Sequence, residues 1–272
     1  EVKFISLGLL EKGAVEGNVI GLLGNNTPRW LLGEVATQSI KCMPLGIYSD
    51  ALESEIEYLI EHSNCNIVFV EDEEQADKML SLSNSVNKIS LIIFDEEKGM
   101  NKYNDKRLIS YRELLKIGKN EDSKASSKYE DIIENITEKD VCVLCPTSGT
   151  TANPKLAVIE HGALIRHSKR YLEADPKNEK DDYVSVLPLP WIIEQKYALA
   201  KWSICRMRVN FVEDTDTMLD DLREIGPTFL LLAPRVWEQI AADIRSKIMD
   251  SSFLKRFIFN FTIKLMRLKI IF

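Results

Sequence analysis

The stretch "VIGLLGNNTPRW", residues 19–30, indicates the fold class of this 272-residue chain. Its apolar run Val19–Leu23 predicts a short buried strand. The polar residues that follow, Asn25, Asn26 and Thr27, all suit a helix N-cap, and Pro28 suits the first helical turn. Apolar side chains then recur on one side of residues 30–40, which predicts a helix. The stretch therefore predicts a strand that leads directly into a helix.

The same alternation of strand and helix continues along the chain. We expect further strands at residues 43–50, 66–72, 90–96, 141–145, 157–159, 184–187, 209–212 and 229–233, and helices at 54–62, 75–82, 162–172, 192–203, 217–224 and 235–248. Several of these strands are apolar at consecutive positions, which is typical of strands buried on both faces. The pattern predicts an α/β fold of mostly parallel sheets with flanking helices.

A polar stretch without periodicity divides this pattern. We expect residues 118–137 to be a linker or surface loop between a first α/β part, residues 1–117, and a second, residues 138–272. Hydrophobic residues make up 45% of the chain and charged residues 28%, as in globular proteins. The net charge of −7 disfavours a nucleic-acid-binding protein, because such proteins usually carry a basic surface.

The five cysteines fit a reducing compartment, and we expect a cytoplasmic protein. Cys142 and Cys145 form a C-x-x-C motif, which can bind metal or carry redox chemistry. They lie inside the apolar run "VCVLC", where residues three apart point to opposite faces of a strand. No second such pair is present, so we interpret them as buried thiols and predict no metal site.

The loop "TSGTTANPK", residues 147–155, concentrates groups that can hold a phosphate. We predict that Thr147, Ser148, Thr150 and Thr151 donate hydrogen bonds, that Gly149 lets backbone N–H groups turn inward, and that Lys155 supplies a positive charge. An ordinary polar turn is the alternative. The loop lacks the Gly-Lys-Ser/Thr of a Walker A motif, so it does not predict a P-loop NTPase.

Four motifs, in order along the chain, resemble the adenylate-forming superfamily of acyl-CoA synthetases, luciferases and adenylation domains. They are "GNNTPRWLLGEVATQSIKCMPLGIY", "TSGTTANPKLAVIEH", "VSVLPLPWIIEQ" and "TFLLLAPRVWEQI". The third and fourth resemble the long-chain fatty acyl-CoA ligase branch. The chain departs from the family's usual loop at Ala152 and Leu156, where glycine is common. If either backbone were left-handed, a side chain there would cost about 1–3 kcal/mol.

The resemblance implies a partial AMP-binding domain of a ligase that uses fatty acid, Mg-ATP and coenzyme A. A fatty acid carboxylate would attack the α-phosphate of ATP, and the thiolate of coenzyme A would then displace AMP. Thr147, Ser148, Gly149, Thr150, Thr151 and Lys155 would bind the ATP phosphates. The family's later motifs, including its C-terminal lid lysine, do not occur, so we assign no catalytic residue. A ligase for another carboxylic acid and an inactive nucleotide-binding or interaction remnant are the alternatives.

Two further residues are candidates for lining the substrate channel. Trp191 stands where many relatives carry His, and it is either an aromatic wall or a core residue. Arg235 follows a proline at an expected strand end, where ligand sites of α/β proteins gather, although a structural role is the alternative. Glu194 and Gln195 interrupt an apolar run, and we expect them on a surface face of a helix.

The chain starts at Glu1 and stops after "LKIIF", from which we expect a piece of a longer protein. Residues 253–272 carry five cations, no acidic residue and many apolar residues. This segment is either an interfacial helix in peripheral contact with a membrane or a helix that packs against another part of the protein. The sequence leaves the oligomeric state open.

Overall fold

The computed structural model describes residues 1–82, 88–124, 127–147, 154–214 and 216–270, with side chains up to residue 266. The chain forms two compact units, Glu1–Leu230 and Leu231–Phe272, and each is described by itself.

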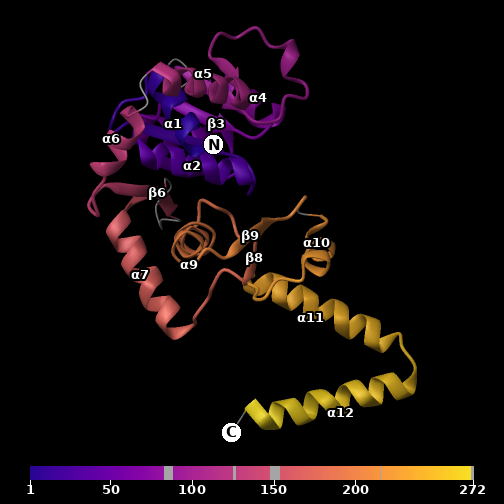
Figure 1. Ribbon diagram of the computed structural model, residues 1–272. Coiled ribbons are helices and arrows are strands. Elements are labelled where there is room, and N and C mark those ends of the chain that lie inside the picture. Colours follow the sequence, from indigo (N-terminus) through magenta and orange to yellow (C-terminus); the bar gives the residue numbers. More distant parts are fainter. Residues whose placement is uncertain (83–87, 125–126, 148–153, 215, 271–272) are drawn as a thin grey trace. The chain divides into compact units, whose positions relative to one another are not determined.

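A seven-stranded sheet organises the first unit, in the order β5-β4-β3-β1-β2-β6-β7 (Figure 1). All its neighbouring strands are parallel except β6 and β7, which are antiparallel. The strands are β1 (Val19–Leu23), β2 (Met43–Ile47), β3 (Ile67–Val70), β4 (Leu91–Phe94), β5 (Leu108–Ser110), β6 (Val141–Thr147) and β7 (Lys155–Glu160). The predicted α/β class with a mostly parallel sheet is confirmed.

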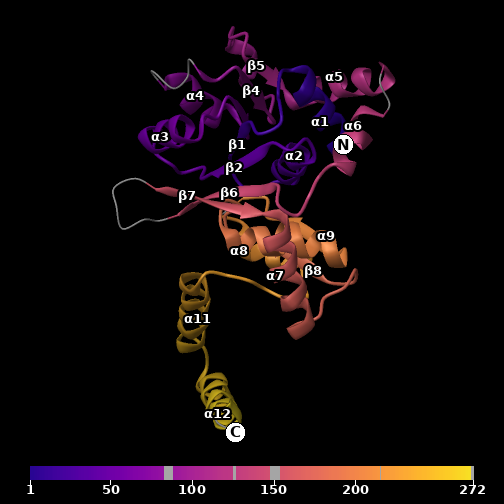
Figure 2. The same cartoon turned by 90° about the vertical axis from the view of Figure 1, so that its left-hand side faces the viewer.

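Helices cover both faces of this sheet (Figure 2). The helices of the first unit up to residue 134 are α1 (Val2–Glu11), α2 (Pro28–Ser39), α3 (Glu53–Ser63), α4 (Glu73–Ser81), the 3-10 helix η2 (Met100–Lys102), α5 (Tyr111–Lys124) and α6 (Lys128–Glu134). Strand residues such as Val19 and Val68 pack with α3 and α4 in one cluster. Leu22 and Phe69 lie against Gly33 of α2 on the other face.

The opening stretch folds as its residues predict. All five residues of β1 are buried, because β1 lies between β2 and β3 with helices on both faces. The Oγ1 of Thr27 accepts a hydrogen bond from the N–H of Trp30 at 3.0 Å, and Pro28 starts α2. Thr27 thus satisfies an N–H group that the first helical turn would otherwise leave without a partner.

Strand β7 differs from the expected buried parallel strand. It forms an antiparallel hairpin with β6 at the edge of the sheet, and Val158 is 59% exposed. The chain between β6 and β7 is too short for the crossover that a parallel pair needs. The apolar residues 157–159 therefore do not indicate burial on both faces.

The expectation of a linker or loop over residues 118–137 is wrong for much of that stretch. Helix α5 continues to Lys124, and α6 covers Lys128–Glu134. Helix α5 packs on α1 so closely that a Cβ at Gly118 would lie 1.7 Å from the carbonyl oxygen of Phe4. Few side chains of α5 are buried, because only one side of the helix lies on α1 and its other sides are polar. The apolar periodicity that indicates a helix is therefore weak in this stretch.

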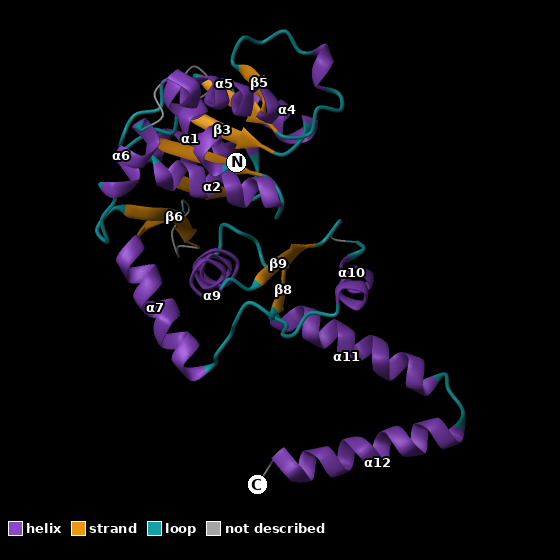
Figure 3. Ribbon diagram, viewed as in Figure 1, coloured by secondary structure: helices purple, strands orange, loops and turns teal. Residues whose placement is uncertain are grey.

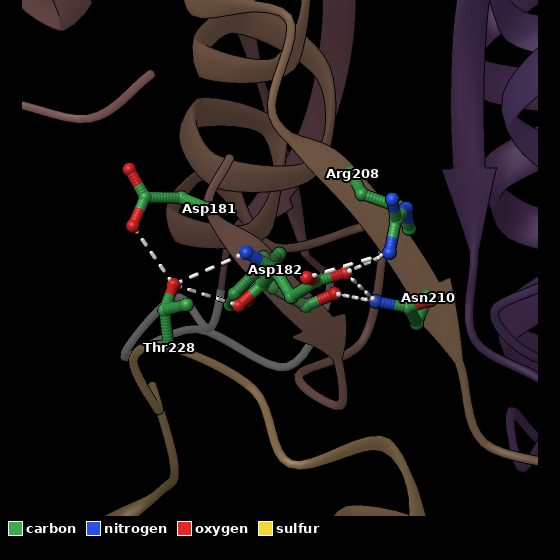
Figure 4. Close-up of polar contacts among 6 residues, drawn as sticks. Asp181, Asp182, Arg208, Asn210 and Thr228 are labelled. Atoms are coloured by element: carbon green, nitrogen blue, oxygen red, sulfur yellow. Dashed lines mark hydrogen bonds and ion pairs between the residues drawn. The ribbon is translucent and has the colours of Figure 1, made fainter. Parts of the chain in front are cut away.

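A second, two-stranded sheet follows in the first unit and consists of the parallel strands β8 (Asp182–Ser185) and β9 (Arg208–Phe211). Polar contacts around Asp182 hold this pair together (Figure 4). The carboxylate of Asp182 accepts from Arg208 and Asn210, each at 3.2 Å, and its backbone N–H donates to Oγ1 of Thr228 at 3.1 Å. Thr228 is thereby tied to β8.

The remaining helices of the first unit complete the pattern (Figure 3). They are α7 (His161–Ala174), α8 (Ile192–Glu194), the π-helix η3 (Gln195–Lys201), α9 (Trp202–Cys205) and α10 (Met218–Ile225). The predicted helix at residues 192–203 is present, but its middle is π-helical. The predicted strand at residues 229–233 is absent, although each of these residues is described.

The second unit contains two helices, α11 (Pro234–Met249) and α12 (Phe253–Ile270). Pro234 occupies the first turn of α11, where its missing N–H costs nothing. Several aromatic and aliphatic side chains of α12 are more than half exposed, including Phe253, Leu254 and Phe257. No helix in the described ranges is long and apolar enough to span a membrane.

Candidate functional site

The candidate site lies at the carboxyl edge of the central sheet. In open α/β sheets, ligands bind beyond the carboxyl ends of parallel strands. Here β1 ends at Leu23, β2 at Ile47 and β6 at Thr147. Residues that follow β1 and β2, and the last residues of β6 itself, line two cavities described below. The parallel pairing of β1 with β2 and of β2 with β6 brings these ends to the same edge.

A mostly apolar cavity of about 720 Å³ lies beside the end of β6. Its walls include Thr147 and Pro154, which belong to the predicted phosphate loop of residues 147–155, together with Tyr48 and Trp191. The remaining lining residues are Ala51, Glu55, Leu59, Cys145, Pro146, Ala157, Ile159, Ile192 and Ile193. An apolar cavity with a few polar groups at one end is the usual form of a small-molecule site.

A second, more polar cavity of about 560 Å³ lies over the ends of β1 and β3. Gly24, Glu71 and Asp72 line it, together with Tyr48, which also lines the first cavity. A Cβ at Gly24 would lie 2.7 Å from the Cβ of Glu71, so only glycine fits this close approach. Burial raises the pKa of Glu71 above its ordinary value.

The predicted phosphate-loop residues fall into two groups. Ser148, Gly149, Thr150 and Thr151 lie outside the described residues, as does Ala152. Thr147 and Lys155 are the last residue of β6 and the first of β7, and they face each other across the hairpin. The Oγ1 of Thr147 donates to the carbonyl oxygen of Lys155 at 3.1 Å. Lys155 is exposed at the loop's end. Their phosphate contacts stay a prediction.

Leu156, which departs from the family's usual glycine, lies within β7 and pairs with Pro146 of β6. The non-glycine residues with positive φ in the described chain are Lys41, Asn64 and Arg206, so Leu156 is not among them. A side chain at position 156 therefore carries no left-handed backbone cost.

The two channel candidates lie in different units. Trp191 caps α8 in the first unit, is 42% exposed and lines the cavity that Thr147 also lines. This position fits a wall residue better than a core residue. Burial raises the pKa of the neighbouring Tyr48 to about 12, and the Trp191 side chain opposes that rise. Arg235 lies in the first turn of α11, in the second unit, so its role at this site stays a prediction.

Glu194 and Gln195 are fully buried, so their expected place on a surface face is wrong. The helix changes from α to π geometry at residue 195, which alters the direction of successive side chains relative to a regular helix. Tyr183 donates to Oε2 of Glu194 at 2.6 Å, and Ser185 donates to Oε1 at 2.5 Å. Burial nevertheless raises the pKa of Glu194 to about 7.

A second buried carboxyl group, Glu34 of α2, escaped the sequence reading. Its Oε2 accepts from Nε2 of Gln195 at 3.2 Å, and Gln38 lies one helical turn away. Burial raises the pKa of Glu34 to about 8, so the carboxyl is mostly protonated at neutral pH. The sequence signal for its burial is the stretch "LLGEVATQS", which places Glu34 on a helix expected to cover the sheet.

Lys201 at the end of the π-helix is a further buried ionisable group. Its Nζ lies 3.4 Å and 3.3 Å from the ring centroids of Tyr171 and Tyr197 and has no hydrogen-bond partner among the described residues. Burial lowers its pKa to about 8. Cation–π attraction offsets only part of the cost of burying an ammonium, which agrees with the lowered pKa of Lys201.

The cysteines and the acidic side chains provide no metal centre within the described residues. No group of three or more His, Cys, Asp and Glu side chains is arranged to bind an ion there. Cys142 and Cys145 are buried free thiols, and burial raises the pKa of Cys145 to about 12. Such thiols are poor nucleophiles at neutral pH.

Comparison with known proteins gives a consistent family assignment. The family model described as AMP-binding enzyme matches residues 1–261. The chain is 26% identical over 259 residues to the long-chain-fatty-acid–CoA ligase ACSBG1 of Rattus norvegicus, covering 93% of this chain and 35% of the relative. It is 25% identical over 268 residues to fatty acyl-CoA synthetase A of Dictyostelium discoideum, covering 94% and 38%. The chain thus spans about a third of the length of these curated relatives.

Solved structures show the same fold. The anthranilate CoA ligase AuaEII in complex with anthranoyl-AMP superposes with a TM-score of 0.68 at 17% identity, covering 86% of this chain and 43% of that one. ATP-bound MatB from Rhodopseudomonas palustris superposes with a TM-score of 0.63 at 17% identity, covering 84% and 42%. At these identities the likeness establishes the fold and leaves the substrate open.

Proposed function

Because the chain belongs to the AMP-binding enzyme family, we propose that it is part of an ATP-dependent long-chain fatty acid–CoA ligase. The observation that supports this most is the cavity of about 720 Å³, which has the end of the phosphate loop on one wall and apolar side chains around it. The names of the two relatives support the choice of acid, because one is a long-chain-fatty-acid–CoA ligase and the other a fatty acyl-CoA synthetase. The chain covers about a third of their length, so the activity is proposed for the complete protein.

The proposed reaction has two steps. In the first, a carboxylate oxygen of the fatty acid bonds to the α-phosphorus of ATP, and the bond to pyrophosphate breaks. In the second, the sulfur of coenzyme A bonds to the acyl carbon, and AMP leaves with the bonding electrons. The protein's part in the first step is positioning and charge stabilisation of the phosphates.

Residues of this chain would hold the phosphates and the acid. Thr147, Lys155 and the loop between them would hold the ATP phosphates, since hydroxyl and ammonium donors suit phosphate oxygens. The apolar wall with Trp191 would exclude water from the reacting carboxylate. Mg²⁺ would enter as the counter-ion of ATP, bound to the ATP phosphates.

The test is the rate of pyrophosphate exchange into ATP by the complete protein with acids of different length. We expect exchange that depends on the fatty acid and is fastest with long chains. Exchange that is faster with an aryl or short-chain acid would replace the proposed substrate while keeping the adenylating activity. Absence of exchange with every acid would reject the proposal.

Peripheral membrane contact through residues 253–272 belongs to the same proposal, together with a cytoplasmic location. The exposed apolar residues and the cations of α12 support it, because such helices bind anionic lipid surfaces. Packing of α12 against another part of the complete protein is the competing explanation.

A further inference from the structure

The segment of residues 186–191, which joins β8 to α8, is fixed by Asn26, which lies in the turn between β1 and α2. The Nδ2 of Asn26 donates to the carbonyl oxygen of Leu187 at 2.6 Å and to Oγ of Ser185 at 2.9 Å. Its Oδ1 accepts from the N–H of Leu189 at 3.0 Å. One side chain therefore serves two backbone groups of this segment and the residue just before it.

Gln195 fixes the same segment from its other end. Its Nε2 donates to the carbonyl oxygen of Leu189 at 2.8 Å and to Oε2 of Glu34 at 3.2 Å. Gln38 continues this buried network to the central sheet, because its Nε2 donates to the backbone oxygen of Cys142 at 3.0 Å. The segment is thus linked to both α2 and β6.

Steric contact fixes the third side of the segment. A Cβ at Gly46 of β2 would lie 2.8 Å from the Cα of Pro190, so the segment packs directly on the strand backbone. The N–H of Trp191 donates to the carbonyl oxygen of Pro188 at 2.9 Å, which closes a turn. As a result, the Trp191 side chain lines the cavity that Thr147 lines at the end of β6.

We propose that Asn26 and Gln195 are positioning residues, which hold residues 186–191 so that Trp191 forms a wall of the cavity beside the phosphate loop. The role in catalysis rests on the proposed ligase function, whereas the role in holding the segment does not. Neither residue needs to touch a substrate for this role. Both act through the backbone of Leu189, at its N–H and at its carbonyl oxygen.

The expected effect follows from the number of bonds that are lost. One ordinary hydrogen bond changes an opening equilibrium several-fold, and Asn26→Ala removes three of them. We therefore expect opening of the segment to rise about ten- to a hundredfold. In the complete ligase, a displaced Trp191 should raise KM for the fatty acid about tenfold or more, with a smaller change in kcat.

The experiment compares Asn26→Ala with the matched control Asn135→Ala. Asn135 also donates from Nδ2 to a backbone oxygen, that of Asp131 at 2.7 Å, but on the exposed helix α6. Hydrogen exchange of the amides of Leu189 and Trp191, both of which donate hydrogen bonds, is measured in the present chain. Steady-state kinetics are measured in the complete protein.

Faster exchange of these amides in Asn26→Ala, with no change in Asn135→Ala, supports the proposal. Unchanged exchange in Asn26→Ala overturns it. If Asn26→Ala does not fold, Gln195→Met provides the second variant, since Met keeps the length of the buried side chain and removes its donor to Leu189. The same two outcomes then apply to it.

The kinetic measurement separates this proposal from the proposed function. If exchange accelerates but the wild-type complete protein does not activate a fatty acid, the ligase function fails and the positioning of the segment stands. A second outcome is an active wild type together with an Asn26→Ala variant that exchanges faster but has an unchanged KM for the acid. Asn26 would then hold the segment, but the position of the segment would not matter for catalysis. That outcome overturns the catalytic role.

Discussion

Glu34→Gln should change how the stability of the protein depends on pH. The Glu34 side chain is fully buried, and burial raises its pKa from 4.5 to about 8. Between these values the unfolded chain releases the proton and the folded chain retains it. The free energy of unfolding contributed by this group therefore falls as pH rises through this range and stays low above pH 8.

The size of this fall follows from the two pKa values. At about 1.4 kcal/mol per pH unit, the wild type should lose roughly 3–4 kcal/mol relative to Glu34→Gln between pH 5 and pH 8. Gln resembles the protonated acid in shape, and its carbonyl oxygen can still accept from Nε2 of Gln195. Burial also raises the pKa of Glu194, to about 7, but that contribution is present in both proteins and cancels in the comparison.

The assay is urea denaturation at pH 5, 6, 7 and 8, followed by circular dichroism. The matched control is Glu61→Gln, at an exposed position on α3. We expect the Glu34→Gln curve to rise above the wild-type curve as pH increases and the control curve to stay parallel to the wild type. Parallel curves for Glu34→Gln would refute the reasoning, because Glu34 would then ionise alike in the folded and unfolded chain.

Four other predictions follow from the site and from α12. In the complete ligase, Lys155→Ala should lower kcat/KM for ATP by about 10²–10³, as removal of an electrostatic donor commonly does, and unchanged kinetics would make Lys155 a surface residue only. Gly46→Ala should destabilise the protein by about 1–3 kcal/mol in urea denaturation, because its Cβ would lie 2.8 Å from the Cα of Pro190, and an unaltered midpoint would contradict that contact. Deletion of the residues after Ser252 should raise the soluble yield of the present chain, because it removes an exposed apolar helix. If the membrane proposal is correct, replacing the five cations of residues 253–272 by Gln should abolish sedimentation with anionic liposomes.

Much of the fold could be predicted from short apolar runs followed by helix caps. In β1 and α2, the burial of Val19–Leu23, the cap at Thr27 and the proline after it all indicate the same structure. Where local signals conflict with tertiary packing, the prediction failed. Helix α5 has a polar surface and a glycine at its contact with α1, so its sequence alone suggests a loop over residues 118–124.

The sequence indicates candidate residues of the site but not their arrangement. Hydroxyls, a glycine and a lysine after a buried strand predict a phosphate loop, which stays a prediction, and Trp191 was a candidate wall residue. The contacts of Asn26 with Leu187 and of Glu34 with Gln195 each join residues 161 apart in sequence. No local periodicity indicates such pairs, and the π-helical geometry after Glu194 further obscured which residues are buried.

The most direct test of the central claim is acid-dependent pyrophosphate exchange by the complete protein, with a long-chain fatty acid such as palmitate and ATP. The account predicts exchange that requires both the acid and ATP, and formation of the acyl-CoA thioester when coenzyme A is added. We further expect the present chain alone to give no exchange, since it covers about a third of the length of its curated relatives. Absence of palmitate-dependent exchange by the complete, folded protein would contradict the account.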